Sequence, residues 1–322
     1  GAAVLKKHWR NLVARYGAYP AVWCAAGEAL MGYYLKPREE KEAESRLSEL
    51  RASWTDIIGH IRAVDPYHHP VTIHPTQYGH DQVSDPAVLD VDMLQTGHGG
   101  YSSLAPTVTM LTESLAREPR MPVLVGEANY EGILESSREE VQRFLFWACL
   151  LSGAAGHTYG ANGLWQVNSR EEPYGPSPHG TSWGDVPWQD AYQLPGSRQV
   201  GLGKHLLERY PWWRFEPHLD WVEPHHSPQN RMLPYAAGIP GQVRLIFIPS
   251  EAVWVLWRGD MVVKGLEPGI TYRGFFFSPK TGQEYPLEPI MPDGHGDYRL
   301  PKPPIFQDWV VVLERKTSPW PG

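Results

Sequence analysis

Two glutamates each come shortly after an apolar run that is typical of a buried β-strand. Glu28 follows residues 21–24 (AVWC), and Glu127 follows residues 122–125 (PVLV) after one glycine. Two carboxyl groups that project from strand ends can act on one bond, one as a general acid and the other as a nucleophile or a general base. That pairing is what cleavage of a glycosidic bond requires. The alternative for either residue alone is a structural carboxylate paired with an arginine.

Other polar and aromatic side chains also follow predicted strands. They could hydrogen-bond sugar hydroxyls, orient Glu127 or stack on a sugar ring, and they are His74, Gln95, His98, Tyr130, His157, Asn162 and Trp165. For His157 a buried core histidine is an equally good interpretation. Glycine precedes each glutamate, and we expect Gly27 and Gly126 to leave room around the two carboxylates.

The strands that would carry these residues alternate with helices. Apolar residues at three- and four-residue spacing predict helices near the N-terminus and over 48–63, 108–117, 138–152 and 196–209. Short apolar runs between them predict strands at 21–24, 71–73, 91–94, 122–125 and 154–159. Such parallel βα units with chemistry at the strand ends are typical of a (β/α)8 TIM barrel. A doubly wound sheet is the competing fold, but the Gly-rich phosphate loop that usually follows its first strand is missing.

Only five barrel strands are evident, and a closed barrel of this kind needs eight. The chain begins where the third helix of a barrel would lie, so we expect these to be strands four to eight, with the N-terminal part of the barrel missing from this chain. The alternative is an incomplete barrel that is nevertheless a complete protein.

Beyond residue 217 the sequence changes character. β-rich runs at 243–248, 253–257, 271–277 and 309–313 are separated by Gly, Pro and Asp turns, with no helices predicted between them. This pattern predicts a small antiparallel β-sandwich. The expected domains are residues 1–217, the C-terminal part of a catalytic barrel, and residues 218–322, the sandwich.

Composition limits the partners. A net charge of -7 argues against nucleic acid, because phosphates are bound by basic surfaces. No apolar stretch is long enough to span a bilayer. The 14 His include no HExxH motif, so we predict neither a metal nor another cofactor. Both cysteines, Cys24 and Cys149, are expected to be buried, and 14 Trp and 16 Tyr fit a protein that stacks on sugars or one with a large aromatic core.

Four segments carry a resemblance to a known family. They are 13–28 (VARYGAYPAVWCAAGE), 94–98 (LQTGH), 122–131 (PVLVGEANYE) and 153–166 (GAAGHTYGANGLWQ). Together they resemble the apiosidase-like glycoside hydrolases, a family also described as collagenases. The C-terminal β-rich part of the chain resembles the so-called collagen-binding domain of that family. The missing zinc motif argues against the collagenase description.

The resemblance implies roles for the two carboxylates. Glu28 would be the general acid/base, and Glu127 would be the nucleophile of a retaining mechanism. Some relatives carry Asp at the position of Glu28, and the characterised relatives act on an apiose-containing side chain of plant cell-wall pectin.

We therefore expect a glycoside hydrolase that cleaves a plant cell-wall or related polysaccharide. The alternative is a non-catalytic carbohydrate- or matrix-binding protein on the same scaffold. The expected partner is an oligo- or polysaccharide, with neither nucleic acid nor membrane. A secreted or periplasmic location would follow if the missing N-terminal part carried a signal peptide. The sequence leaves open the sugar, the linkage, the retaining or inverting outcome and the oligomeric state.

Overall fold

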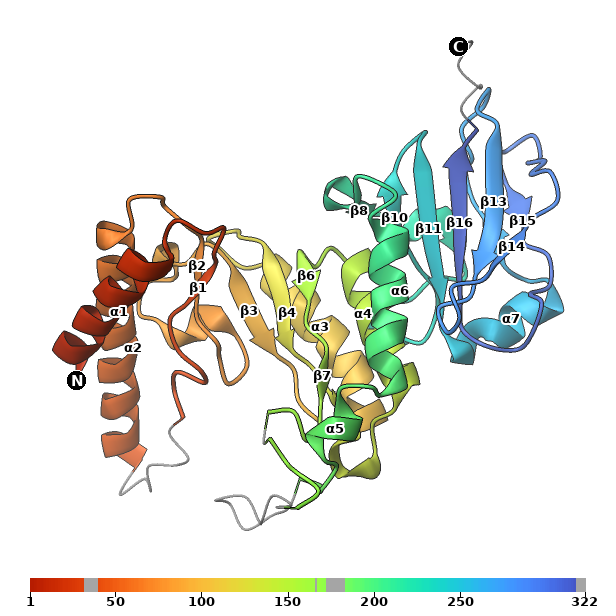
Figure 1. Cartoon of the computed structure of the whole chain (residues 1–322). Helices are drawn as coiled ribbons and strands as arrows, with labels where there is room; N and C mark the ends of the chain where they lie inside the picture. Colours follow the sequence, from red (N-terminus) through yellow and green to blue (C-terminus); the bar gives the residue numbers. More distant parts are fainter. Residues whose placement is uncertain (32–39, 166, 172–182, 317–322) are drawn as a thin grey trace. The chain divides into compact units, whose positions relative to one another are not determined.

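The computed structural model describes the whole chain except residues 32–39, 166, 172–182 and 317–322 (Figure 1). Two compact units are present. Unit 1 consists of Gly1–Thr96, Met110–Ala128 and Ala155–Thr158. Unit 2 consists of Gly97–Thr109, Asn129–Ala154 and Tyr159–Gly322.

Unit 1 contains most of the helices and strands predicted for the N-terminal half. In chain order they are α1 (Ala2–Tyr16), β1 (Trp23–Cys24), α2 (Glu40–Val64), β2 (Val71–Thr72), β3 (Asp92–Gln95), the C-terminal end of α3 (Leu104–Leu115), β4 (Val123–Glu127) and β6 (Gly156–His157). All five predicted strands are therefore confirmed, although each is short. Two 3-10 helices, η2 (Gly79–Gln82) and η3 (Pro86–Val88), lie between β2 and β3.

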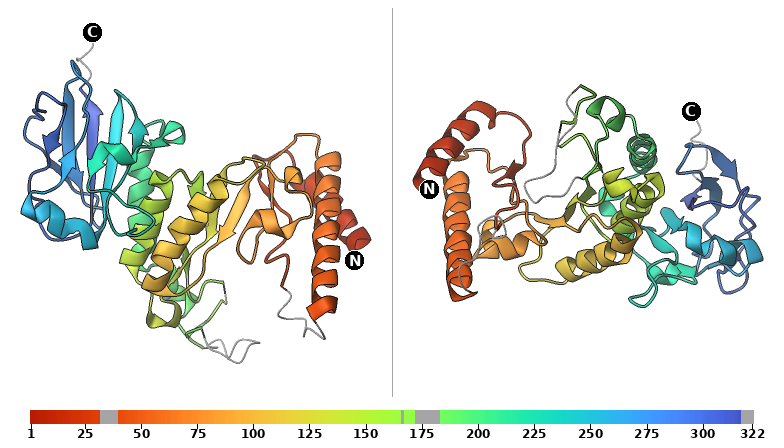
Figure 2. Two further views of the ribbon diagram at one scale, coloured as in Figure 1. Left: turned by 180° about the vertical axis from the view of Figure 1, so that it is seen from behind. Right: turned by 90° about the horizontal axis from the view of Figure 1, so that it is seen from below.

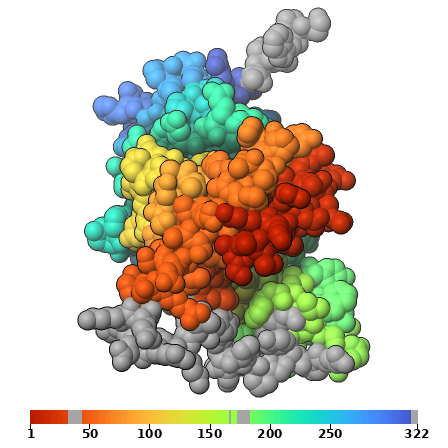
Figure 3. Space-filling model, turned by 90° about the vertical axis from the view of Figure 1, so that its left-hand side faces the viewer, coloured from red at the N-terminus to blue at the C-terminus, as the bar shows by residue number. Residues whose placement is uncertain are grey.

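Helices α1 and α2 pack beside each other. Their surface is seen in Figure 3, where α1 is red and α2 is orange. Their apolar faces bury Trp9 and Val13 from α1 and three isoleucines, Ile57, Ile58 and Ile61, from α2. The same cluster contains Trp23, Val71 and Ile73 from the first two strands and the residues beside them. Burial of these apolar side chains holds β1 and β2 against the helices.

The strands of unit 1 pair in parallel. β1 pairs with β2, and β3, β4 and β6 form a second sheet in that order. Hydrogen bonds from Asp90 N–H to the Val71 carbonyl and from the Thr72 hydroxyl to the Val91 carbonyl tie β2 to the segment before β3. Paired strands thus follow one another along the chain, as in a barrel, whereas a doubly wound sheet reverses its order.

The C-terminal part of unit 2 contains two antiparallel sheets. The larger has the order β14-β13-β16-β11-β10-β8, and the smaller has the order β15-β12-β9. Their bounds are β8 (Glu216–Pro217), β9 (Val222–Glu223), β10 (Tyr235–Ile239), β11 (Val243–Ile248), β12 (Val262–Val263), β13 (Tyr272–Phe277), β14 (Glu284–Pro286), β15 (Tyr298–Arg299) and β16 (Trp309–Arg315). One core joins Val222 and Val263 of the small sheet to Ile246, Val311 and Leu313 of the large sheet. The predicted antiparallel sandwich is therefore present.

Helix α4 (Glu139–Leu151) covers the other face of the large sheet, with α6 (Pro195–Leu207) beside it (Figures 1 and 2). Phe144 and Trp147 of α4 pack on Phe247 of β11, with ring centroids 6.1 and 6.4 Å apart. Because both faces of the sheet are covered, all six residues of β11 are buried.

One predicted strand is wrong. Residues 253–257 form part of helix α7 (Val253–Arg258). The buried residues of this helix are Val253 and Leu256, which are three positions apart, so the apolar run follows the period of a helix and not the alternation of a strand. Gly259 ends the helix with a φ of 78°, a left-handed value that glycine adopts without strain.

One smaller expectation also fails. Cys24 is exposed, whereas Cys149 is buried as expected. A short helix that was not predicted, α5 (Trp188–Ala191), precedes α6. No helix among the described residues is long and apolar enough to cross a membrane.

Candidate active site

The structure brings Glu28 and Glu127 together in unit 1. Glu127 is the last residue of β4, and a β-bulge at this point places it opposite Gln95, the last residue of β3. Glu28 lies four residues beyond β1, where backbone hydrogen bonds join Ala26 and Ala29 to His74. Four side chains predicted for the site thus come from the ends of four strands. We call Glu28, His74, Gln95 and Glu127 the carboxylate cluster.

Gln95 bridges the two carboxylates. Its Nε2 donates to Glu28 Oε1 at 3.1 Å and to Glu127 Oε1 at 3.0 Å. Sequence alone offered sugar binding or orientation of Glu127 for this residue, and the contact with Glu28 was not foreseen. Both hydrogens of one amide group are used, so Gln95 fixes the two carboxylates relative to each other.

His74 contacts both glutamates in a different way. The backbone N–H of Glu28 donates to His74 Nδ1 at 3.3 Å, and His74 Nε2 lies 2.8 Å from Glu127 Oε2. Since Nδ1 accepts a hydrogen bond, the ring hydrogen is on Nε2, and Nε2 donates to the Glu127 carboxylate. His74 therefore keeps one tautomer and favours the ionised form of Glu127.

The backbone of Glu28 is unusual. Its φ is 41°, in the left-handed region that residues other than glycine seldom adopt. Such conformations cost free energy and persist where the surroundings hold them. Here the hydrogen bond from the Glu28 N–H to His74 is one of the contacts that hold this conformation.

The two glycines differ in how closely they are packed, and the room that they leave around the carboxylates stays a prediction. A Cβ atom on Gly126 would lie 2.4 Å from Cγ of Met93, so this glycine makes room for a neighbouring methionine. A Cβ on Gly27 would meet no atom within 4 Å, so no close contact requires glycine there.

Three further predicted residues form a row of rings in unit 2. His98 stacks on Tyr130 at 4.5 Å between centroids, and Tyr130 lies 6.4 Å from Trp165 with an interplanar angle of 30°. Tyr130 belongs to β5 (Tyr130–Glu131), which pairs in parallel with β7 (Gly160–Ala161). Trp165 is 49% exposed, so one end of this row is open to solvent. We call these three side chains the aromatic row.

The last two predicted residues are less accessible. Both ring nitrogens of His157 are buried, and burial lowers the pKa of His157 to about 4. Asn162 in unit 2 is fully buried, and its side-chain amide has no hydrogen-bond partner among the described residues. These placements favour a core position for both over direct contact with a substrate.

Sequence reasoning overlooked Glu131, which is buried in unit 2. It accepts a hydrogen bond from the Tyr159 hydroxyl at 2.6 Å and from the Gly196 N–H at 3.0 Å. Burial raises the pKa of this carboxyl group. Glu131 anchors β5 to the first turn of α6, and its position next to Tyr130 was the only signal in the sequence.

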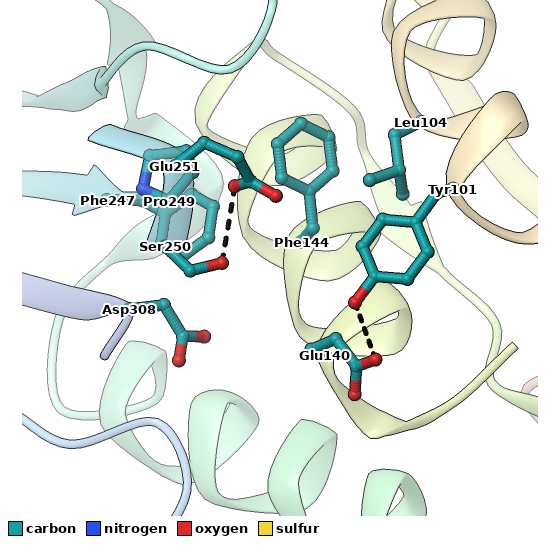
Figure 4. Close-up of a pocket in the computed structure, with 9 residues that line it drawn as sticks. All are labelled: Tyr101, Leu104, Glu140, Phe144, Phe247, Pro249, Ser250, Glu251 and Asp308. Atoms are coloured by element: carbon teal, nitrogen blue, oxygen red, sulfur yellow. Dashed lines mark hydrogen bonds between the residues drawn. The ribbon is translucent and has the colours of Figure 1, made fainter. Parts of the chain in front are cut away.

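A small cavity in unit 2 is lined by three carboxylates, Glu140, Glu251 and Asp308, together with Tyr101 (Figure 4). Tyr101 donates to Glu140 at 2.6 Å. The cavity has a volume of about 10 Å³, enough for one water molecule but too small for a sugar. None of the predicted site residues lines it. Within the described part of the chain, no group of three or more His, Cys, Asp or Glu is arranged to hold a metal ion.

The fold is shared with solved structures of glycoside hydrolases. One, described as a glycoside hydrolase, is 18% identical and matches with a TM-score of 0.71 over 99% of this chain and 70% of that one. Another, a glycoside hydrolase of family 5 from Bacteroides vulgatus, is 18% identical and matches with a TM-score of 0.70 over 98% of this chain and 67% of that one. These likenesses show a TIM-barrel-like fold followed by an antiparallel sheet domain.

Sequence comparison identifies the family. No curated protein matches the chain. The family described as apiosidase-like, catalytic domain, matches residues 2–214, which is more than half of the chain. The resemblance noted from the four sequence segments is thereby confirmed, and the chain belongs to the apiosidase-like family.

Proposed function

We propose that this protein is a retaining glycoside hydrolase in which Glu127 is the nucleophile and Glu28 is the general acid/base. The observation that carries the proposal is the bridge from Gln95 Nε2 to one oxygen of each carboxylate. It holds two carboxyl groups close to each other in unit 1, just beyond the ends of strands. Glycoside hydrolysis needs two such groups that flank the bond to be cleaved.

The bridge also limits the distance between the carboxylates. Two hydrogen bonds of 3.0 and 3.1 Å to one nitrogen hold Glu28 Oε1 and Glu127 Oε1 within about 6 Å of each other. If the two amide hydrogens point about 120° apart, the two oxygens are about 5.3 Å apart. Retaining enzymes have carboxyl groups about 5–5.5 Å apart, whereas inverting enzymes need about 6.5–9.5 Å to admit a water molecule.

The two environments support different roles. Glu127 accepts from both His74 and Gln95, which favours the ionised carboxylate that a nucleophile requires. In the first step Glu28 protonates the leaving oxygen while Glu127 attacks the anomeric carbon, giving a covalent glycosyl-enzyme. In the second step Glu28 takes a proton from water, which attacks the same carbon and releases Glu127.

For the substrate we propose a plant cell-wall or related polysaccharide, as family membership suggests. The aromatic row supports a sugar ligand, because its rings can stack on the apolar face of a sugar and Trp165 is exposed. The same row would also suit a carbohydrate-binding protein without activity, so turnover has to be tested directly.

The test is the stereochemistry of hydrolysis. Wild-type protein, Glu127→Gln and Glu28→Gln are assayed on a panel of aryl glycosides and plant polysaccharides, and the first anomer released by the wild type is identified by proton NMR. We expect retention of configuration, and a fall in kcat of at least about a thousandfold for Glu127→Gln. Release of the inverted anomer would refute the retaining assignment. Unchanged activity of Glu127→Gln would refute the choice of nucleophile.

A second experiment separates the two roles. With Glu127→Ala, added azide should restore turnover and give a glycosyl azide of inverted configuration, because azide then attacks in place of the missing carboxylate. With Glu28→Ala, azide should give a product of retained configuration, because it replaces water at the glycosyl-enzyme. The opposite pattern would exchange the two roles. Binding of a polysaccharide by a wild-type protein that releases no sugar would favour the non-catalytic alternative.

A further inference from the structure

Helix α7 in unit 2 presents aromatic side chains that take no part in the proposed reaction. Trp254 is 59% exposed and Trp257 is 37% exposed. The Phe306 ring contacts both indoles, with its centroid 4.6 Å from that of Trp254 and 6.1 Å from that of Trp257. The neighbouring Ile305 is 55% exposed. We call these four residues the α7 surface.

The packing of α7 does not explain these side chains. Val253 and Leu256 already fill the sandwich core, so the helix is held in place by residues on its other face. A single exposed apolar side chain needs no explanation. Four large exposed apolar side chains in one group are typical of a binding surface. Their exposure to water is unfavourable in free energy, and a bound ligand that covers them removes this unfavourable exposure.

Polar groups border the α7 surface. Trp254, Arg258 and Asp260 are among the residues that line an open depression of about 400 Å³. The Lys302 ammonium group lies 5.6 Å from the ring centroid of Trp257. Arg299 adds a third cation, held by a hydrogen bond to the Gly259 carbonyl. The three cations outnumber the two carboxylates nearest to α7 in the chain, Asp260 and the exposed Glu251, although the net charge of the whole chain is -7.

We propose that the α7 surface binds an acidic polysaccharide chain. Sugar rings would stack on the indoles of Trp254 and Trp257, while Arg258 and Lys302 would pair with sugar carboxylates. The Asp260 carboxylate accepts hydrogen bonds from sugar hydroxyls. A uronic acid polymer carries at most one charge per sugar. A nucleic acid is charged more densely and would be repelled more strongly by the rest of this anionic protein. The proposal does not require Glu28 or Glu127 to be catalytic.

The test uses the whole chain carrying Glu127→Gln, so that no probe is degraded. Electrophoresis in native gels containing polygalacturonate gives a dissociation constant, and gels containing hydroxyethyl cellulose serve as the neutral comparison. We expect polygalacturonate to retard the protein, and the double variant Trp254→Ala, Trp257→Ala to weaken binding at least about tenfold. Trp213→Ala is the matched control, because Trp213 is 73% exposed and lies outside the α7 surface. It should bind like the parent.

Thermal melting checks that the double variant is folded. A second variant, Arg258→Gln, removes one cation and leaves the core intact, and it should by itself weaken binding severalfold. Equal binding by the double variant and the parent would overturn the proposal. So would equal retardation by hydroxyethyl cellulose, tighter binding of a poly(dT) oligonucleotide, or a dimer in size-exclusion chromatography that the double variant abolishes. Wild-type activity on a small aryl glycoside is measured separately. Failure of the proposed catalysis can therefore be distinguished from failure of the proposed polysaccharide binding.

Discussion

At the scale of single residues, the carboxylate cluster depends on one amide. Gln95 donates to both carboxylates from its single side-chain nitrogen, and it lies on β3 between Glu28 and Glu127 in the chain. Its value is geometric, because a glycosidase must hold its two carboxyl groups at a separation fixed to within about 1 Å.

Gln95→Leu tests this role. Leucine has a similar volume but no donor, so the ionised Glu127 loses a charge-assisted hydrogen bond worth about 1.5–3 kcal/mol, and Glu28 loses the amide that holds it near Glu127. We expect kcat to fall by about tenfold to several hundredfold, with a smaller change in KM. Steady-state kinetics on an aryl glycoside, with melting temperature as a folding control, decides the matter. A variant with wild-type kcat would show that the bridge is dispensable.

The aromatic row offers a second test at this scale. A Cβ on Gly160 would lie 2.2 Å from Cδ1 of Tyr130, so Gly160→Ala must displace the Tyr130 ring. If the row binds substrate, KM should rise severalfold while kcat changes little. Gly201→Ala in α6 is the control, because a Cβ there meets nothing within 4 Å. Equal kinetics for both alanine variants would remove Tyr130 from the substrate site.

How far the sequence predicts the site depends on the kind of contact. Placement at strand ends was enough to pair Glu28 with Glu127, because the carboxyl ends of parallel strands gather on one side. The bridge by Gln95 depends on a β-bulge between β3 and β4, and no residue pattern in the sequence predicted that bulge. The strained backbone of Glu28 was equally invisible, since glutamate is not a residue that signals a positive φ.

At the scale of elements, Asp65 joins the end of α2 to β1. Trp23 Nε1 donates to its Oδ2 at 2.9 Å, and the N–H groups of Tyr67 and His69 donate at 3.0 and 2.9 Å. Burial alone would raise the pKa of Asp65, but these hydrogen bonds outweigh it and lower the pKa to about 2.

The sign of the pH effect follows from this. A folded-state pKa below the ordinary 3.8 stabilises the folded protein above pH 4, by about 2 kcal/mol, and the contribution is lost as the pH falls towards 2. Asp65→Asn should therefore lower the free energy of unfolding at pH 7 and make much less difference near pH 2.5. Urea unfolding at both pH values measures this. Asp56→Asn, which removes a more exposed pair with Lys6, should change stability by less than about 1 kcal/mol at either pH.

Elements also show where sequence patterns mislead. The run at 253–257 is rich in Val and Trp, which favour strands, yet its burial repeats every three residues and it forms α7. Tertiary packing outweighed the strand propensity of these residues, because the core between the sheets accommodates Val253 and Leu256 from one side of a helix. The longer runs at 243–248 and 309–313 lie in a sheet covered on both faces, and they were predicted correctly.

At the scale of the whole molecule, α4 is the element that bears on domain organisation. Sequence patterns assigned it to a catalytic barrel ending at residue 217, and that boundary stays a prediction. In the structure α4 lies in unit 2, where Arg143 pairs with Asp308 at 2.6 Å, both residues being buried. Breaking such a pair on one side leaves an uncompensated buried charge, which costs about 3–5 kcal/mol.

Arg143→Met should accordingly destabilise the protein by about 3–5 kcal/mol in urea unfolding, because Asp308 is left buried without its partner. The double variant Arg143→Met, Asp308→Leu should recover most of that loss, since it removes the charge as well as the pair. A double variant as unstable as Arg143→Met would mean that packing around the arginine, and not the charge of Asp308, sets the cost.

The same packing predicts the effect of ending the chain at residue 217. The aromatic face of α4, with Phe144 and the fully buried Trp147, would lose Phe247 and Phe277 as partners and become exposed to water. Exposure of these rings removes several kcal/mol of apolar burial, so we expect a shortened protein that aggregates or melts without a cooperative transition. Calorimetry of residues 1–217 beside the whole chain tests this. A shortened protein that melts cooperatively and keeps its activity would show that residues 1–217 fold without the C-terminal sheets.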